Sequence, residues 1–419
     1  MYIETTTETV KQDKVSNRLQ DRGLGRSVPA VPACMPKPQW LPRLKHYCLP
    51  MKPKWDRTSN KIVWTSPISA VELKSEHLNP GFFFTSTHSL ALDTALDTEL
   101  NKLIAKLKAK QAPFNVAPYV EFINKGGRIM VALVDLSNDI KLTYPGIAEV
   151  DSTHRVLGGS LAKIGLLYAA YQHQFDMNVE GKATPGSFSP GRQTSLKSIY
   201  DISPPLVFSF NNDLRNALDN ICSNCSASRI SRTLGLSYVN SALWQSGLYD
   251  CHWGGIWLGA HFNEFDSRTG KWECDKDPYF YKDNCTATGC HTDPKGGARI
   301  VVTALSVTTF FTLLAQDRLV DPHSSAAVRS NLTAQMGACG SSFKRGLVDT
   351  GRIGAGDSIC SKIGVTSTVS HEGALITKSS GKKYVAVVLI QCRPGDQRLG
   401  SSVRYGLIKH LDRLIEANP

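Results

Sequence analysis

One segment of the sequence spaces a serine and a lysine as nucleophilic catalysis requires. Ser160 and Lys163 lie three residues apart in the mostly apolar stretch 158–170, and a helix there would bring both side chains to one face. A buried lysine loses the solvation of its charged form, so a neutral Lys163 could accept the hydroxyl proton of Ser160. Backbone N–H groups at the helix start would suit a developing oxyanion. The alternative for this segment alone is a helix-capping serine and a surface lysine.

Two further segments carry polar residues that fit the same chemistry. Ser223 lies within 221–227, at the end of a predicted helical stretch, and Lys362 opens the segment 362–366 ahead of the last predicted hairpin. With these motifs in this order, the chain resembles class A serine β-lactamases and the related penicillin-binding proteins, whose signature is S-x-x-K, S-D-N and K-T-G. The resemblance covers roughly residues 90–416.

The resemblance implies a role for each motif. Ser160 would form the acyl-enzyme, and its backbone N–H and that of Val365 would form the oxyanion hole, with Gly364 beside them in the substrate site. Ser223 would relay a proton to the leaving group, and Lys362 would hold Ser223 in place and supply positive potential. We expect no cofactor and no metal ion for this chemistry.

Three positions depart from the family pattern where the substrate would bind. Cys225 stands where the second motif has an asparagine, whose amide would orient an acylamido side chain of the substrate. Ile363 replaces the usual hydroxyl residue of the third motif. Glu372, before Gly373, stands where many members carry an arginine, and it would repel a substrate carboxylate. These departures argue against efficient penicillin hydrolysis.

The residue that would activate water for deacylation is open in the sequence. Family members use a glutamate in a long loop, within E-x-x-x-N. This chain offers Glu273, which we favour, and Asp277, and neither reproduces that motif. Without such a base an acyl-enzyme would persist, as in transpeptidase-type relatives.

The second motif also has a rival. Tyr238-Val239-Asn240 resembles the Y-x-N motif of carboxypeptidase-like and class C-like relatives, and this assignment would make Tyr238 the proton shuttle and place Asn240 in the substrate site. We favour Ser223, because its distance from Ser160 along the chain and the helix that follows it fit the family better.

The elements that must position these residues come from both ends of the chain. Apolar periodicity predicts a helix over 89–110, hairpins over 127–144 and 373–391, and a closing helix over 403–415. Residues 157–355 are predicted to be mostly helix and loop. We therefore predict an α+β fold, an antiparallel sheet flanked by terminal helices with an all-helical subdomain. The resemblance implies that this fold is of the β-lactamase/transpeptidase kind.

The predicted domain organisation follows from the same pattern. Residues 1–85 form a proline-rich, basic N-terminal arm, and residues 86–419 form the hydrolase domain. Within that domain, 86–156 and 356–419 supply the sheet part and 157–355 the helical part.

Composition narrows the partners and the compartment. Lysine and arginine outnumber the acidic residues 48 to 36, but no basic stripe with interleaved aromatics indicates a nucleic-acid groove. We see no export signal and no membrane-spanning stretch, whereas eleven cysteines suit a periplasmic or secreted protein, so the compartment stays open. For the cysteines we favour free buried thiols, or disulfides such as Cys285–Cys290 and Cys339–Cys360, over a zinc site. The oligomeric state is not indicated.

These observations lead to one functional hypothesis and one alternative. The hypothesis is a serine hydrolase that acts through a Ser160 acyl-enzyme on an amide, lactam or ester bond of a small-molecule or peptide-like substrate. The alternative is a catalytically impaired ligand-binding protein of the penicillin-binding kind.

Overall fold

The computed structural model describes residues 51–56, 61–67, 121–122, 124–137, 147–181, 214, 217, 224–234, 236–250, 254–259, 262, 265–266, 271–272, 300–333, 343, 346–347 and 351–417. All of them belong to one compact unit, residues 37–419. The helix predicted over 89–110 and the second strand of the hairpin predicted over 127–144 lie outside the described residues. Within the predicted arm, β1 (Met51–Asp56) and β2 (Lys61–Pro67) pair as an antiparallel hairpin.

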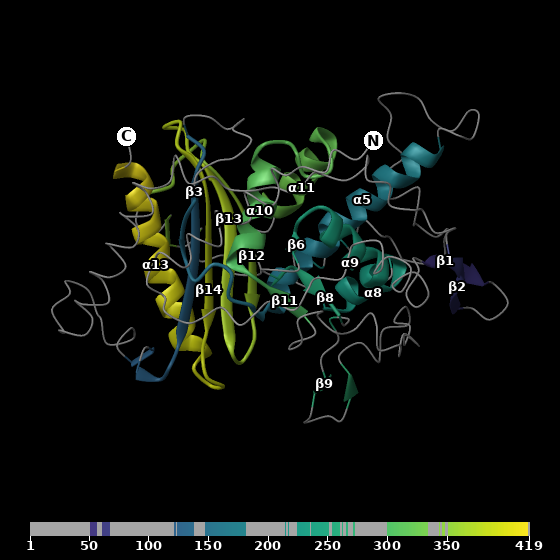
Figure 1. The fold of residues 1–419 in the computed structure, drawn as a ribbon, viewed down its shortest axis with the longest axis horizontal. Helices are drawn as coiled ribbons and strands as arrows, with labels where there is room; N and C mark the ends of the chain where they lie inside the picture. Colours follow the sequence, from purple (N-terminus) through teal and green to yellow (C-terminus); the bar gives the residue numbers. More distant parts are fainter. Residues whose placement is uncertain are drawn as a thin grey trace, which may run out of the picture. The chain divides into compact units, whose positions relative to one another are not determined.

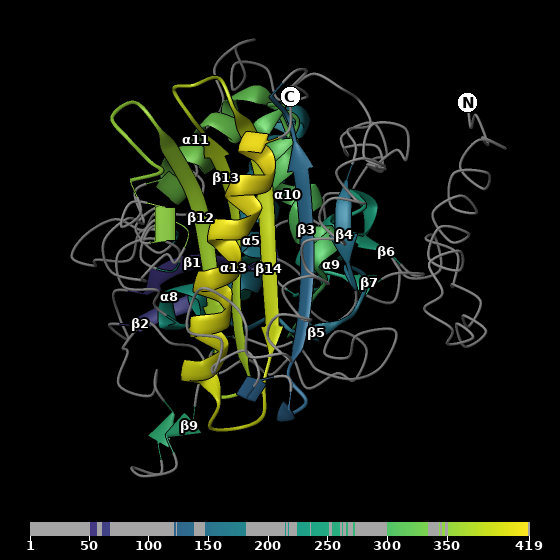
Figure 2. The ribbon, with the colours of Figure 1, turned by 90° about the vertical axis from the view of Figure 1, so that its left-hand side faces the viewer.

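A five-stranded antiparallel sheet forms the centre of the fold, in the order β12-β13-β14-β3-β4 (Figures 1 and 2). Its strands are β12 (Ser358–Val365), β13 (Val369–Thr377), β14 (Lys383–Gln391), β3 (Arg128–Asp135) and β4 (Ala148–Val150). The hairpin predicted over 373–391 is confirmed as β13 and β14, and Gly381 in its turn has φ +90°, a conformation that favours glycine. The sheet brings the two ends of the chain together, because β3 pairs directly with β14.

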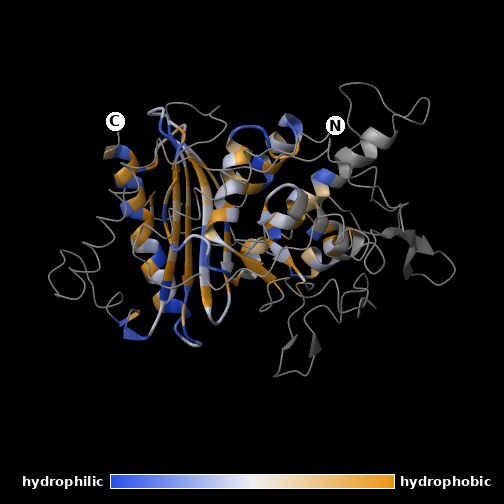
Figure 3. Cartoon of the chain, viewed as in Figure 1, coloured by the Kyte–Doolittle hydropathy of each residue, from blue (hydrophilic) through white to orange (hydrophobic). Residues whose placement is uncertain are grey.

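Helices cover both faces of this sheet. The predicted closing helix is confirmed as α13 (Gln397–Ala417), which packs on one face, while α10 (Ala304–Ala315) packs on the other. Alternate residues of β14 enter two separate apolar clusters, so that Val387 packs on the α10 side and Val388 on the α13 side. This double burial explains why β14 is an almost continuous apolar run, which Figure 3 shows along the sheet.

The region between the two sheet segments contains helices and several short strands. Its helices are α5 (Lys163–Gly181), α8 (Asn224–Leu234), α9 (Leu236–Gln245), α10 and α11 (Pro322–Thr333). The prediction of an all-helical region is wrong in one respect, because β5 (Val156–Leu157), β11 (Ile300–Val302) and β8 (Trp257–Leu258) form a three-stranded sheet in the order β5-β11-β8. Two-stranded pairs also form between β6 (Tyr249–Asp250) and β7 (Gly254–Gly255), and between β9 (Phe265–Asp266) and β10 (Lys271–Trp272).

The apolar stretch 300–315 is divided into two elements. Its first three residues form β11, and the helix α10 begins at Ala304. Thr303 ends the strand and caps the helix, since its Oγ1 accepts a hydrogen bond from the Ser306 N–H at 3.1 Å. No helix among the described residues is both long and apolar enough to cross a membrane.

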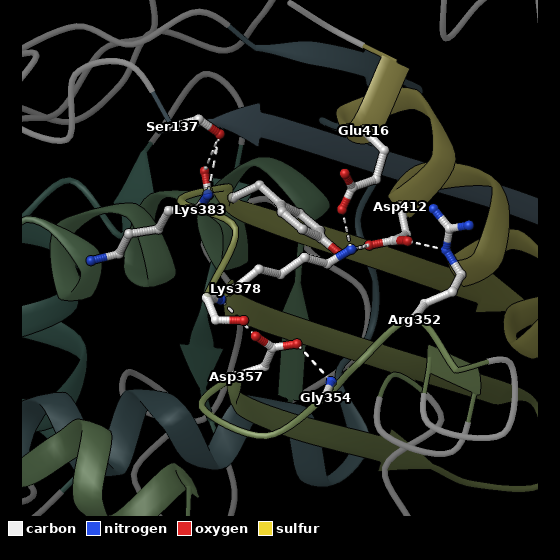
Figure 4. A network of polar contacts seen from close by, with 10 residues as sticks. Ser137, Arg352, Gly354, Asp357, Lys378, Lys383, Asp412 and Glu416 are labelled. Carbon is white, nitrogen blue, oxygen red and sulfur yellow. Dashed lines mark hydrogen bonds and ion pairs between the residues drawn. The ribbon is translucent and has the colours of Figure 1, made fainter.

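A buried network of charged side chains fastens α13 to the sheet (Figure 4). Asp412 of α13 is fully buried, forms ion pairs with Arg352 and with Lys378 (2.5 Å), and accepts a hydrogen bond from the Tyr384 hydroxyl at 2.7 Å. Lys378 also pairs with Glu416 at 2.5 Å. Burial raises the pKa of the Tyr384 hydroxyl well above its usual value, so this hydroxyl stays protonated and donates to Asp412.

The described cysteines differ in state. Cys360 and Cys392 are free, buried thiols, and Cys225 is disulfide-bonded. The suggested disulfide Cys339–Cys360 is therefore wrong, because the Cys360 sulfur contacts the Thr333 hydroxyl at 2.9 Å instead. Cys285 and Cys290 lie outside the described residues. Within the described part of the chain, no group of three or more His, Cys, Asp or Glu side chains could hold a metal ion.

Candidate active site

Ser160 lies on a short 3-10 turn between β5 and α5. The turn spans Gly159–Ala162 and α5 begins at Lys163, so the predicted single helix is a 3-10 turn followed by an α-helix. Residues three apart on a 3-10 turn lie nearly above one another, which keeps Ser160 and Lys163 on the same side. Gly159 has φ +51°, and Ser160 is partly exposed. The predicted nucleophile therefore lies where a substrate can reach it.

Lys163 is fully buried, so the alternative of a surface lysine is wrong. Its Nζ donates a hydrogen bond to Oδ1 of Asn224 at 2.9 Å and lies 5.4 Å from the centroid of the Phe262 ring. The amide fixes where the amine sits, and the ring adds apolar surface beside it. The amine of Lys163, three residues after Ser160, is therefore fixed beside Asn224 and Phe262.

The second motif meets Lys163 through a residue that the sequence analysis did not single out. Asn224 is the first residue of α8, directly after Ser223, and its side-chain oxygen contacts Lys163. An amide one position before Cys225 therefore makes the contact with Lys163. Asn224 belongs to the segment 221–227 that the sequence analysis considered. The sequence does not tell which residue of this segment faces α5, because that depends on where α8 begins. Ser223 itself lies outside the described residues.

Cys225 is half-buried in the first turn of α8. Because its sulfur is part of a disulfide, it offers no thiol to a substrate.

The third motif lies on β12, against the turn that carries Ser160. A Cβ atom on Gly364 would lie 2.5 Å from the Leu161 nitrogen and 2.6 Å from the Gly158 oxygen, so only glycine allows this approach. A Cβ atom on Gly159 would lie 3.4 Å from the Val365 nitrogen. The backbone of β12 thus runs alongside the Ser160 turn, as the predicted oxyanion hole requires.

Lys362 and Ile363 occupy neighbouring positions on β12. Lys362 is fully buried and pairs in register with Gly373 of β13, whereas Ile363 is partly exposed. A Cβ atom on Gly373 would lie 2.6 Å from the Val307 side chain, so this glycine lets α10 pack closely behind the motif.

Glu372 does not face the substrate, contrary to our expectation. It is fully buried, accepts a hydrogen bond from the Phe343 N–H at 3.3 Å, and lies 3.8 Å from the Arg404 guanidinium of α13. Because successive residues of a strand point to opposite faces, Glu372 points to the α13 side while Gly373 points to α10. The predicted repulsion between Glu372 and a substrate carboxylate is therefore wrong.

Asn240, the third residue of the rival motif on α9, forms hydrogen bonds within the fold. Asn240 is fully buried; its Nδ2 donates to the Leu258 carbonyl at 2.7 Å, and its Oδ1 accepts from the Leu258 N–H at 2.9 Å. These two bonds hold β8 against α9. Tyr238 lies within α9, and its side chain is outside the described part of the structure.

The proposed deacylating acids are not placed by the structure. Glu273 directly follows β10, and both it and Asp277 lie outside the described residues. Their role stays a prediction.

Comparison with known proteins gives one family match and a set of similar folds. Residues 268–401 match the model of the Beta-lactamase enzyme family. No curated protein matches the chain. The solved structures that are similar to this chain include a β-lactamase from Sphaerobacter thermophilus, with 15% identity over 70% of this chain and 93% of that chain and a TM-score of 0.46. They also include a β-lactamase from Chitinophaga pinensis, with 13% identity over 71% of this chain and 96% of that chain and a TM-score of 0.45. A β-lactamase from Burkholderia ambifaria is similar to the same degree (15%, 72%, 99%, 0.45).

The α+β architecture seen here is the one predicted from the motifs. Over residues 268–401, the family match supports the superfamily of serine β-lactamases and penicillin-binding proteins for this chain.

Proposed function

We propose that this chain is a serine hydrolase that cleaves an amide, lactam or ester bond through an acyl-enzyme on Ser160. The observation that carries the proposal is the buried Lys163, held by Asn224 one turn from a partly exposed serine. A buried amine beside an accessible hydroxyl is the arrangement that activates a serine nucleophile. The close approach of β12 to the same turn supports an oxyanion hole there.

The reaction would proceed in two halves. In the first, the Ser160 hydroxyl proton passes to Nζ of Lys163, while Oγ bonds to the carbonyl carbon and the carbonyl electron pair moves onto oxygen. The N–H groups of Ser160 and Val365 would stabilise this oxyanion. When it collapses, the bond to the leaving group breaks; Ser223 would give its hydroxyl proton to the leaving amine or alkoxide and take up in exchange the proton held by Lys163, so that both residues return to their starting states.

In the second half, water would attack the Ser160 ester and release the acid. We propose Glu273 as the base for this water. The buried Lys362 would contribute positive potential beside the site throughout.

Covalent labelling tests this proposal directly. The protein is incubated separately with a fluorescent penicillin and a fluorophosphonate, and the labelled residue is identified by peptide mass spectrometry. We expect a label on Ser160 that Ser160→Ala abolishes, while Ser402→Ala, which removes an exposed serine of α13, retains it. Labelling by the fluorophosphonate alone would indicate an ester or peptide substrate rather than a lactam. No label on Ser160 from either reagent would leave the ligand-binding alternative.

A further inference from the structure

The carbonyl of Leu157 lies on the free edge of the small sheet, three residues before Ser160. Gly158 donates its N–H to the Ile300 carbonyl at 3.0 Å, across the β5–β11 pair. Because neighbouring residues of an antiparallel strand point their backbone groups to opposite sides, the backbone N–H and C=O of Leu157 point away from β11. Strand β5 is at the edge of the sheet β5-β11-β8, so no strand of that sheet donates a hydrogen bond to this carbonyl.

A buried histidine of the central sheet contacts the Leu157 carbonyl from this open side. His371 on β13 is fully buried, and its Nε2 lies 2.9 Å from the Leu157 oxygen. Its Nδ1 accepts a hydrogen bond from the Ile390 N–H at 3.1 Å. Since Nδ1 accepts, the ring proton must be on Nε2, which therefore donates to Leu157. One imidazole thus joins β13 and β14 to the strand that leads into the Ser160 turn.

The histidine is held in this neutral form and orientation by its surroundings. Burial lowers the pKa of His371 to about 3, and the nearby Arg404 guanidinium acts in the same direction. Arg404 also donates to the His371 backbone carbonyl at 2.8 Å, which fixes this part of β13 from the α13 side. A buried imidazole that only filled space could be replaced by an apolar side chain of similar size; this one satisfies two backbone groups from different sheets.

We propose that His371 is a positioning residue for the nucleophile. By holding the Leu157 carbonyl, it fixes the last residue of β5 and hence the direction in which the Gly159–Ala162 turn presents Ser160 to Lys163 and to β12. This inference rests on the proposed function of Ser160.

Two replacements at position 371 separate positioning from simple packing. His371→Leu removes both side-chain hydrogen bonds, whereas His371→Gln keeps one donor and one acceptor at similar reach. Tyr384→Phe is the matched control, because it removes one buried hydrogen bond from β14, at the Asp412 network that fastens α13. For each variant, cooperative unfolding is checked first, and the maximal rate constant and apparent dissociation constant for fluorophosphonate labelling of Ser160 are then measured separately.

We expect the maximal labelling rate of His371→Leu to fall about a hundredfold, as a misplacement of about 1 Å does to a reacting group, with little change in the apparent dissociation constant. His371→Gln should recover much of that rate, and Tyr384→Phe should label like the wild type. The inference is overturned if the wild type is labelled and a folded His371→Leu labels at the wild-type rate. If the leucine variant does not fold, His371→Met, which also lacks both side-chain hydrogen bonds, is measured in its place, and the same result overturns the inference. If the wild type is not labelled at Ser160, the proposed function fails and this inference fails with it.

Discussion

Acidification should destabilise the protein through His371, in a pH range set by the burial of this one side chain. The pKa of the imidazole is lowered from its ordinary value of 6.5 to about 3 in the folded protein, mainly by burial. Between these two values the unfolded chain binds a proton at this site and the folded chain does not, so the free energy of unfolding falls as the pH falls. The contribution of the neutral His371 to the free energy of unfolding is complete above pH 6.5 and is lost as the pH drops toward 3.

The size of the effect follows from the same two pKa values. Each pKa unit corresponds to about 1.4 kcal/mol, so the whole interval corresponds to about 5 kcal/mol, and about 3 kcal/mol should be lost by a pH of about 4.5. Such a loss is a large share of the stability of an ordinary domain. Protonation would also break the bond from the Ile390 N–H to Nδ1, because a charged imidazole has no acceptor.

Urea unfolding, followed by tryptophan fluorescence at several values between pH 7 and 4.5, measures this directly. His371→Gln cannot take up the proton, so the stability difference between wild type and variant should shrink toward low pH by about 1.4 kcal/mol per pH unit. His323→Gln is the matched control for a histidine-to-glutamine replacement, because His323 is an exposed histidine of α11. A constant difference between wild type and His371→Gln across this range would refute the reasoning.

Three other replacements test the site and the frame around it. Asn224→Ala should slow the labelling of Ser160 up to about tenfold, because a hydrogen bond between neutral groups contributes about 0.5–1.5 kcal/mol, while Asn224→Asp should retain the contact with Lys163. Gly364→Ala should lower both stability and labelling, since the added methyl group would push β12 away from the Ser160 turn. Asp412→Asn should cost about 3–5 kcal/mol in urea unfolding, because it removes the anion of a buried charged network, but should leave the labelling rate of the folded fraction unchanged.

Each of these three expectations has an outcome that contradicts it. Wild-type labelling by Asn224→Ala would show that Lys163 needs no amide partner. A Gly364→Ala protein of normal stability and labelling rate would mean that β12 does not depend on this close approach. Slower labelling by folded Asp412→Asn would connect the α13 network to the Ser160 site.

Local patterns predicted the parts of the fold whose residues lie close together in the chain. The hairpin β13–β14 and the closing helix α13 follow from periodicity and a glycine turn within a few residues. The spacing of Ser160 and Lys163 is equally local. Both residues are therefore expected on one side whether the segment is one helix, as predicted, or a 3-10 turn followed by a helix, as the structure has it.

The side on which Glu372 lies could not be predicted in this way. Every residue from Val369 to Ile376 is buried, so β13 shows no alternation of polar and apolar positions from which the two faces could be told apart. The contacts with Arg404 and Phe343, which come from segments distant in sequence, identify the face of Glu372. The same holds for Asn224, which its neighbours Ser223 and Cys225 do not distinguish until α8 begins.

The small sheet β5-β11-β8 was missed for a further reason, which also explains two buried polar residues. Strands of two or three residues are too short to carry a periodic signal or to be stable alone. Both of its edges are closed by side chains: His371 binds the Leu157 carbonyl on β5, and Asn240 binds both backbone groups of Leu258 on β8.

In sequence, Asn240 resembled part of a catalytic motif and His371 matched no motif. In the structure each one completes the hydrogen bonds of an edge strand beside Ser160 or Lys163, since β5 leads into the Ser160 turn and β8 precedes Phe262 at the Lys163 amine. We therefore expect the precision of the candidate site to depend on His371 and Asn240, two buried side chains outside the S-x-x-K, S-D-N and K-T-G motifs.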